Sequence, residues 1–135
     1  MALQFSTTLR NNMLDQFEST TGTSAKLRIS TGSAPANCAA ADSGTLLAEL
    51  TLPSDWMNAA SSGSKTLAGS WTDSAADGTG TAGHFRIKDS SGTTVHCQGT
   101  VTATGGGGDL TLDNTSITSG QAVTITTFTL TAGNA

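Results

Sequence analysis

Charged residues are scarce in this chain. Only 12% of its 135 residues are Asp, Glu, Lys or Arg, against about a quarter in ordinary soluble domains. The formal net charge is −4, so the chain lacks the basic excess that binds nucleic acid or an anionic membrane surface. Apolar runs fall far short of the ~20 residues of a membrane-spanning helix. We therefore expect no nucleic-acid partner and no membrane partner.

Cysteine is scarce, and we expect no secretory leader. The N-terminal segment MALQFSTTLRNN has no apolar stretch of signal-peptide length, which gives no support to ordinary secretion. Cys38 and Cys97 are the only cysteines. Without a secretory signal, two buried free thiols are the simpler interpretation, and a disulfide between them stays open.

Small and β-branched residues fill the space that charge leaves. The chain has 25 Thr, 16 Ser and 16 Gly. Thr suits a pleated, half-exposed surface, and regular apolar alternation argues against disorder. The length fits one domain, residues 1–135. We expect an N-terminal helical arm over 1–22 and, over 23–135, an all-β body: an antiparallel β-sandwich or jelly roll of about seven strands.

The first segment carries the only helical pattern. Leu9, Met13 and Phe17 recur every fourth residue, with Leu14 beside them, which predicts an apolar stripe. The polar residues expected on the opposite face are Arg10, Asn11, Asp15 and Glu18. Residues 6–8 offer hydroxyls for the N-cap, and Gly22 suits the C-terminal end. The apolar stripe should pack on its own domain, or on a partner chain if the helix is an assembly arm.

From Ala25 onward the apolar period is two. The alternation predicts strands near residues 25–30, 45–52, 65–71, 83–89, 93–101, 109–114 and 122–132. In the last strand Val123 and Phe128 fall on opposite faces, which predicts a bulge or twist near 126–127. Turn signals every 8–14 residues favour a sandwich or jelly roll.

The clearest local signal is a hairpin around SSG, residues 90–92. A three-residue loop with Gly92 in the left-handed conformation pairs Ile87 with Val95 and Phe85 with Cys97. The same register pairs Arg86 with His96 and His84 with Gln98 on the outer face. The prediction is specific, because a slip of one residue would scatter the apolar side chains over both faces.

Four consecutive glycines, 105–108, separate two strand-like segments. A phosphate-binding loop would lead into a helix, usually with a lysine close by, whereas this one leads into the strand pattern DLTLDN. We expect a turn or crossover that needs positive φ or close backbone approach. Gly106 and Gly107 are therefore candidate residues for a geometric demand, including contact with a neighbouring subunit.

No combination of reactive side chains suggests chemistry. His84 and His96 could begin a metal site, but they lack a third ligand, and exposed or partner-facing histidines are the simpler interpretation. The two glutamates, Glu18 and Glu49, are isolated, and no nucleophile motif is present. We expect no catalytic residue, no bound metal and no cofactor.

The two tryptophans are the candidate anchors. Trp56 and Trp71 lie in or beside expected loops, and aromatic side chains are scarce at 4% of the chain. Trp in a loop often anchors a protein interface. A Trp that plugs one end of the β body is an equally good interpretation. The candidate contact residues are Leu9, Met13, Phe17, Trp56, Trp71, Gly106 and Gly107.

Several stretches resemble a family of small structural proteins of tailed bacteriophages and prophages. They are MALQFSTTLRNNMLDQFE, LRISTGSAPANC, TLLAELTLPSDWMNAASSGSKTLAGSW, GTAGHFRIKDSSGTTVHCQGTVTATGGGGDLTLDN and SGQAVTITTFTLTAGNA. The resemblance covers essentially the whole chain. The resemblance implies a virion protein without enzymatic activity. The chain is similar in size and expected architecture to the jelly-roll cement proteins that decorate phage heads.

The resemblance implies a place and partners. A cement protein is made in the bacterial cytoplasm, binds the major capsid protein on the exterior of the capsid, and often forms its own dimer or trimer. A second function stays open, that of a tail, neck or fibre component that binds a host-surface glycan. Exposed aromatic side chains near one end of the body would favour that alternative.

Overall fold

The computed structural model describes residues 3–133 and contains one helix and ten strands in that range. The elements, in chain order, are α1 (Thr7–Thr21), β1 (Lys26–Thr31), β2 (Leu46–Thr51), β3 (Ser64–Thr66), β4 (Trp71–Asp73), β5 (Gly80–Lys88), β6 (Val95–Ala103), β7 (Leu110–Leu112), β8 (Ser116–Ile117), β9 (Val123–Ile125) and β10 (Thr129–Thr131). The expected all-β body with one N-terminal helix is confirmed. The jelly-roll arrangement stays a prediction.

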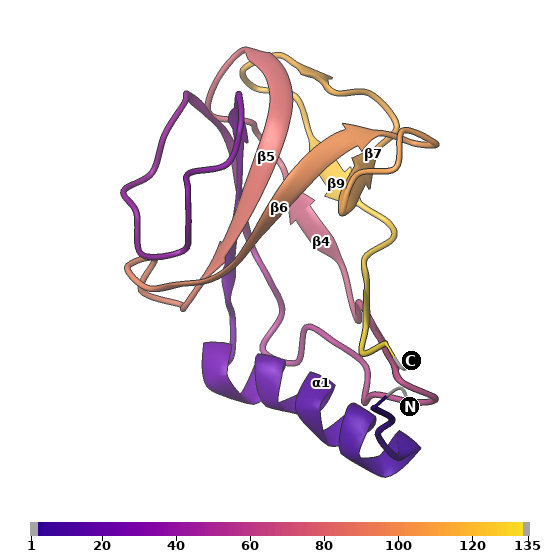
Figure 1. Ribbon diagram of the computed structural model, residues 1–135. Helices are drawn as coiled ribbons and strands as arrows, with labels where there is room; N and C mark the ends of the chain where they lie inside the picture. Colours follow the sequence, from indigo (N-terminus) through magenta and orange to yellow (C-terminus); the bar gives the residue numbers. More distant parts are fainter. Residues whose placement is uncertain (1–2, 134–135) are drawn as a thin grey trace.

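The helix begins and ends where its sequence indicates. The Ser6 hydroxyl accepts a hydrogen bond from the Leu9 N–H at 3.2 Å, which satisfies one of the N–H groups that the first turn leaves unpaired. Gly22 follows the last turn with φ +90°, and its N–H donates to the Glu18 carbonyl. The helix lies across one end of the β body (Figure 1).

The main sheet has the order β2-β1-β5-β6-β7, with β8 paired to the start of β5. All pairs in it are antiparallel except β6 and β7, which run parallel. The long strands β5 and β6 curl over the body (Figure 1). The expected antiparallel sheet therefore contains one parallel pair, made by the segment that follows β6.

Two expected strands are each divided in the structure, which raises the count above about seven. The expected strand 65–71 gives way to β3 and to β4, of which only Trp71 falls in that range, and the segment 122–132 forms β9 and β10. The short strand β8 was not expected. β4 pairs with β9, while β3 pairs with β10. The break between β9 and β10 falls at residues 126–128, where the phase of the apolar pattern changes.

The hairpin forms, but its register was predicted wrongly by two residues. Ile87 pairs with Cys97 and Phe85 with Gly99, while Arg86 and His84 pair with Gln98 and Thr100. The loop is longer than SSG because the Asp89 carboxylate accepts the backbone N–H groups of Thr93 and Thr94. A shift of two leaves Phe85 and Ile87 on the core face, whereas an irregularity between Ile87 and Lys88 places Val95 opposite Lys88 instead of Ile87.

The four glycines make the parallel pairing possible. Gly105 and Gly107 have φ of +87° and +80°, and a Cβ on Gly106 or Gly108 would lie 2.8 Å from Thr102 side-chain atoms. The Gly108 N–H donates to the Thr102 hydroxyl at 2.9 Å, so the chain returns closely along the end of β6. Parallel neighbours ordinarily need a long crossover. Here the return over 104–109 suffices, because glycine permits both the turns and the contact.

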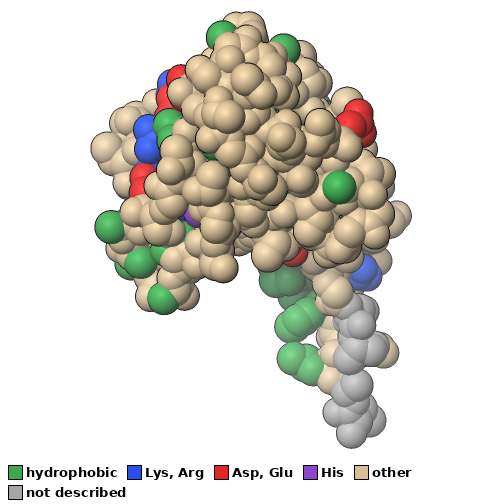
Figure 2. Space-filling model, turned by 90° about the horizontal axis from the view of Figure 1, so that it is seen from above, with side chains coloured by type: hydrophobic (Ala, Val, Ile, Leu, Met, Phe, Trp, Pro, Cys, Tyr) green, Lys and Arg blue, Asp and Glu red, His purple; other side chains and the backbone are tan. Residues whose placement is uncertain are grey.

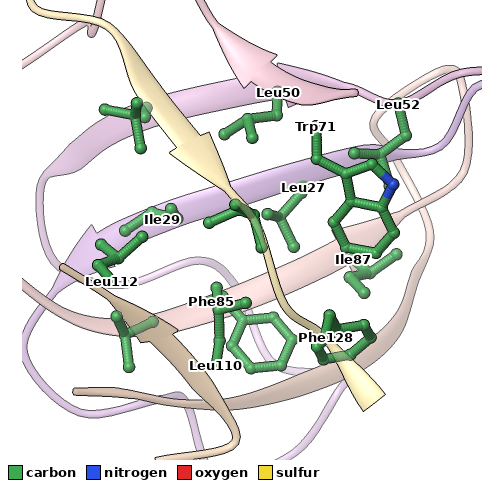
Figure 3. Close-up of a cluster of buried hydrophobic side chains, with 14 of the residues drawn as sticks. Leu27, Ile29, Leu50, Leu52, Trp71, Phe85, Ile87, Leu110, Leu112 and Phe128 are labelled. Atoms are coloured by element: carbon green, nitrogen blue, oxygen red, sulfur yellow. The ribbon is translucent and has the colours of Figure 1, made fainter. Parts of the chain in front are cut away.

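The core lies on the concave side of the curled sheet. Leu27, Ile29, Phe85 and Ile87 meet Trp71 and Phe128 there, and none of the six is more than 3% exposed (Figure 3). Aromatic rings form a row through the core, from Phe17 through Trp56, Trp71 and Phe128 to Phe85, with successive centroids 5.5–5.9 Å apart. Such tilted and edge-to-face pairs are favourable ring geometries.

Candidate interaction surface

The helix α1 faces the body with Leu14 and Phe17, as expected, but it is fastened there mainly by polar residues, and Leu9 and Met13 face outward instead of inward. The Glu18 carboxylate accepts the backbone N–H groups of Trp56 and Met57, each at 3.1 Å. Asn11 accepts the Gly63 N–H at 2.9 Å, and the Arg10 guanidinium donates to the Ala132 carbonyl at 2.8 Å. These residues were predicted to face outward. Glu18 and Asn11 face inward because the segment after β2 presents backbone N–H groups that need acceptors, and Arg10 faces inward because its guanidinium donates to the Ala132 carbonyl.

A buried lysine completes this attachment. Lys65 of β3 is 3% exposed, and its ammonium lies 2.8 Å from Asp15 and 3.0 Å from Glu18. Burial by itself would lower the pKa of Lys65, but the hydrogen bonds to the two carboxylates outweigh burial and raise that pKa. The hydrogen bond from Lys65 lowers the pKa of Asp15. The docked side of α1 is therefore an ion-paired contact.

The opposite side of α1 exposes apolar side chains. Leu9 and Met13 are each 44% exposed, and Leu3 and Phe5 of the preceding segment are 73% and 37% exposed. Figure 2 shows hydrophobic side chains gathered on the part of the molecule that projects from the body. We call Leu9, Met13, Gln16 and Thr20 the outer stripe, because they follow one another at i, i+4, i+7 and i+11 on one helical face.

The aromatic residues among the other predicted contact residues lie wholly or partly inside the fold. Trp56 and Trp71 are fully buried, and Phe17 is partly buried with its ring against Trp56. The Trp56 indole N–H donates to the Gly22 carbonyl, and that of Trp71 reaches the Trp56 and Ala68 carbonyls. The two tryptophans therefore have no surface to offer a partner, whereas Phe17 keeps a partly exposed side chain. Gly106 and Gly107 are exposed and meet the demand of the β6–β7 connection.

The outer face of the main sheet carries a cluster that sequence reasoning missed. We call it the ionic layer, and its members are Lys26, Arg28, Arg86 and Lys88 with the carboxylates of Asp42 and Glu49. Register places Lys26 opposite Lys88 and Arg28 opposite Arg86. Like charges opposite each other are unfavourable, so this face needs the carboxylates that cover it.

The segment 32–45 supplies that cover. Arg86, 3% exposed, donates to the Asn37, Cys38 and Ala40 carbonyls and to Asp42 at 2.6 Å. Asp42 also contacts Lys88 at 2.5 Å and Arg28 at 3.3 Å. The hydrogen bond from Lys88 is the main cause that lowers the pKa of Asp42, and Arg86 adds to it. The Asp42 carboxylate therefore offsets part of the positive charge of Arg28, Arg86 and Lys88.

The histidines occupy two different environments. His84 is 1% exposed, and its Nδ1 lies 3.0 Å from the Gly32 carbonyl, so the expectation of an exposed or partner-facing residue was wrong for it. His96 lies at the start of β6, half-buried beside α1. Within residues 3–133, no group of three or more His, Cys, Asp or Glu side chains is placed to hold a metal ion.

The cysteines are both free and half-buried. Burial raises the pKa of the Cys97 thiol to about 11, and nearby Cys38 and Asp109 add to the effect. A thiol with so high a pKa carries little thiolate at neutral pH, and the thiolate is the reactive form. Cys97 therefore acts as a small apolar side chain beside the core.

A hollow of about 610 Å³ lies between α1 and the segment after β2. Its charged lining residues are Asp15, Glu18, Asp55 and Lys65, and three of these already form the attachment of the helix. The alternative of a glycan-binding module expected exposed aromatic side chains, whereas both tryptophans are in the core. The outer stripe is therefore the better candidate for contact with another molecule.

Comparison with known proteins gives no family assignment. No protein-family model, curated protein or solved structure matches the chain. Across the described residues, no helix is both long and apolar enough to cross a membrane.

Proposed function

We propose that this chain is a structural protein of a bacteriophage particle, a decoration protein that binds the major capsid protein on the exterior of the shell. The observation that carries the proposal is the orientation of α1. A helix held to its body by Asp15, Glu18 and their partners keeps Leu9 and Met13 in solvent. Exposed apolar side chains on a firmly attached element are typical of protein contact sites, which supports a protein that assembles with other subunits, copies of itself included.

The surface of the body suits adhesion. Charged side chains are sparse on the face seen in Figure 2, which is mainly uncharged. Hydroxyl-rich surfaces form wide, wet contacts in which water bridges polar groups. Each such contact is weak, but contacts repeated over many linked copies give strong overall binding. In this proposal the protein acts without turnover and without a cofactor, as a homo-oligomer that bridges shell subunits.

The test is the number and position of copies in an intact particle. Quantitative mass spectrometry of purified particles should find hundreds of copies per shell, and electron cryomicroscopy should place them on the capsid exterior. A handful of copies at one vertex would instead assign the chain to the neck or tail. Complete absence from particles would contradict both assignments.

A further inference from the structure

The outer stripe of α1 combines a projecting side chain with a hollow. Leu9 projects from the first half of the helix. Beyond Met13 the same face borders a hollow of about 220 Å³, lined by Met13, Gln16, Phe17, Thr20, Thr21 and His96. The projecting Leu9 side chain and the hollow therefore lie on one face of one helix, on either side of Met13.

The spacing makes this face complementary to itself. Leu9 and Phe17 are each four residues from Met13, which is about 6 Å along a helix axis. If two helices cross antiparallel with their Met13 residues at the two-fold axis, each Leu9 lies opposite Phe17 of the other copy. An isologous contact of this kind uses the same patch on both subunits.

The charges permit the same arrangement. The outer stripe contains no ionisable side chain, while the charged residues of α1 are held against the body: Arg10, Asp15 and Glu18. Of the described residues that line the hollow, His96 alone is titratable. In a chain of net charge −4, two copies can meet here without opposing carboxylates. Antiparallel helices also align their dipoles favourably.

We propose that the partner of the outer stripe is a second copy of this chain, bound as an antiparallel α1–α1 dimer with Leu9 of each copy in the hollow of the other. The inference deepens the proposed function, because it names the occupant of the apolar face. The shell contact then belongs to another part of the dimer. The dimer is tested on the isolated chain, and the virion role is tested on purified particles. Either proposal can therefore be contradicted while the other remains.

The first experiment measures the mass of the chain in solution. Sedimentation equilibrium over a concentration series should show a monomer–dimer equilibrium. Leu9→Asp should weaken the dimer at least tenfold, because it places a charge in an apolar hollow. Thr8→Asp adds the same charge on an exposed side of the helix away from the outer stripe and should leave the dimer unchanged. Circular dichroism checks that both variants fold.

The second experiment tests the register. Under mild oxidation, Met13→Cys should give a covalent dimer on a non-reducing gel, while Thr8→Cys and the parent chain with its native cysteines should not. A chain that stays monomeric at every concentration overturns the proposal. So does an oligomer that Leu9→Asp leaves intact, or a covalent dimer that Thr8→Cys forms as readily as Met13→Cys.

Discussion

The two faces of β5 are both buried, by opposite kinds of chemistry. Phe85 and Ile87 point into the apolar core, while Arg86 and Lys88 point into the ionic layer beneath segment 32–45. The first face is stabilised by removal of apolar surface from water. The second is buried only because each cation finds carboxylate or carbonyl oxygens. Burial of side chains in this protein therefore depends on hydrogen-bond and ion-pair partners as much as on hydrophobicity.

The largest effect should come from the apolar face. Phe85→Ala removes a ring that contacts Phe128 in the core. Loss of so large a buried side chain costs about 3–5 kcal/mol of unfolding free energy. Urea denaturation followed by tryptophan fluorescence measures this loss. If Phe85→Ala lowers the free energy of unfolding less than Arg86→Met does, the expected order of the two faces is wrong.

The ionic face should respond less, and locally. Arg86→Met removes the contacts to Asp42 and to three carbonyls of segment 32–45. The expected cost is about 2 kcal/mol, because lost charged hydrogen bonds are partly offset by relief of the buried charge. Hydrogen exchange should accelerate over residues 33–42 before it does so in β1. Uniform acceleration through the sheet would show that this face is not separate from the core.

The β6–β7 connection should be next in size. Gly107→Ala places a side chain at φ +80° and should cost about 1 kcal/mol. Gly106→Ala should also destabilise, because its Cβ would lie 2.8 Å from Thr102 atoms. Gly133→Ala is the matched control, since Gly133 lies outside the positive-φ region and a Cβ there has nothing within 4 Å. Equal denaturation midpoints for all three variants would contradict the geometric role of the glycines.

Acid should weaken the ionic face. The pKa of Asp42 is lowered from 3.8, mainly by Lys88, so its contribution to stability is present above pH 4 and is lost as pH falls through the lowered pKa. Asp15, Glu49 and Asp109 shift in the same direction. Urea midpoints between pH 7 and pH 2 should fall below pH 4, and Asp42→Asn should flatten that fall.

A matched charge removal serves as the control for the acid experiment. Asp55→Asn, in the segment after β2, deletes a carboxylate outside the ionic layer. Its acid limb should follow that of the parent chain. If Asp42→Asn and Asp55→Asn behave alike, the acid response is a matter of net charge and does not arise from the layer over β5.

Local patterns predicted the elements whose information is contiguous in the chain. A hydroxyl cap within residues 6–8, which the structure places at Ser6, the positive φ of Gly22 and Gly92, and the need for glycine at 105–108 follow from backbone geometry within a few residues. The hairpin register failed because the Asp89 side chain extended the loop. Apolar alternation nevertheless placed Phe85 and Ile87 correctly, because the register shift was even.

The candidate surface needed the tertiary structure. Leu9 and Met13 were identified from their spacing, but the spacing alone gave them the wrong preferred environment. The carboxylates of α1 accept hydrogen bonds from the backbone N–H groups of Trp56, Met57 and Ala60. These groups belong to a segment far from α1 in the chain, so the spacing within the helix could not reveal them. The ionic layer escaped prediction for the same reason, because Asp42 and Arg86 are brought together only by the fold.

The sequence by itself determined an all-β body with one capped helix, since period-two alternation, turn residues and capping act over short distances. Only the tertiary structure decided which side of the helix faces the body and which charges are buried. Both choices depend on hydrogen-bond partners from distant segments, because burial of a polar side chain costs free energy unless such a partner is present.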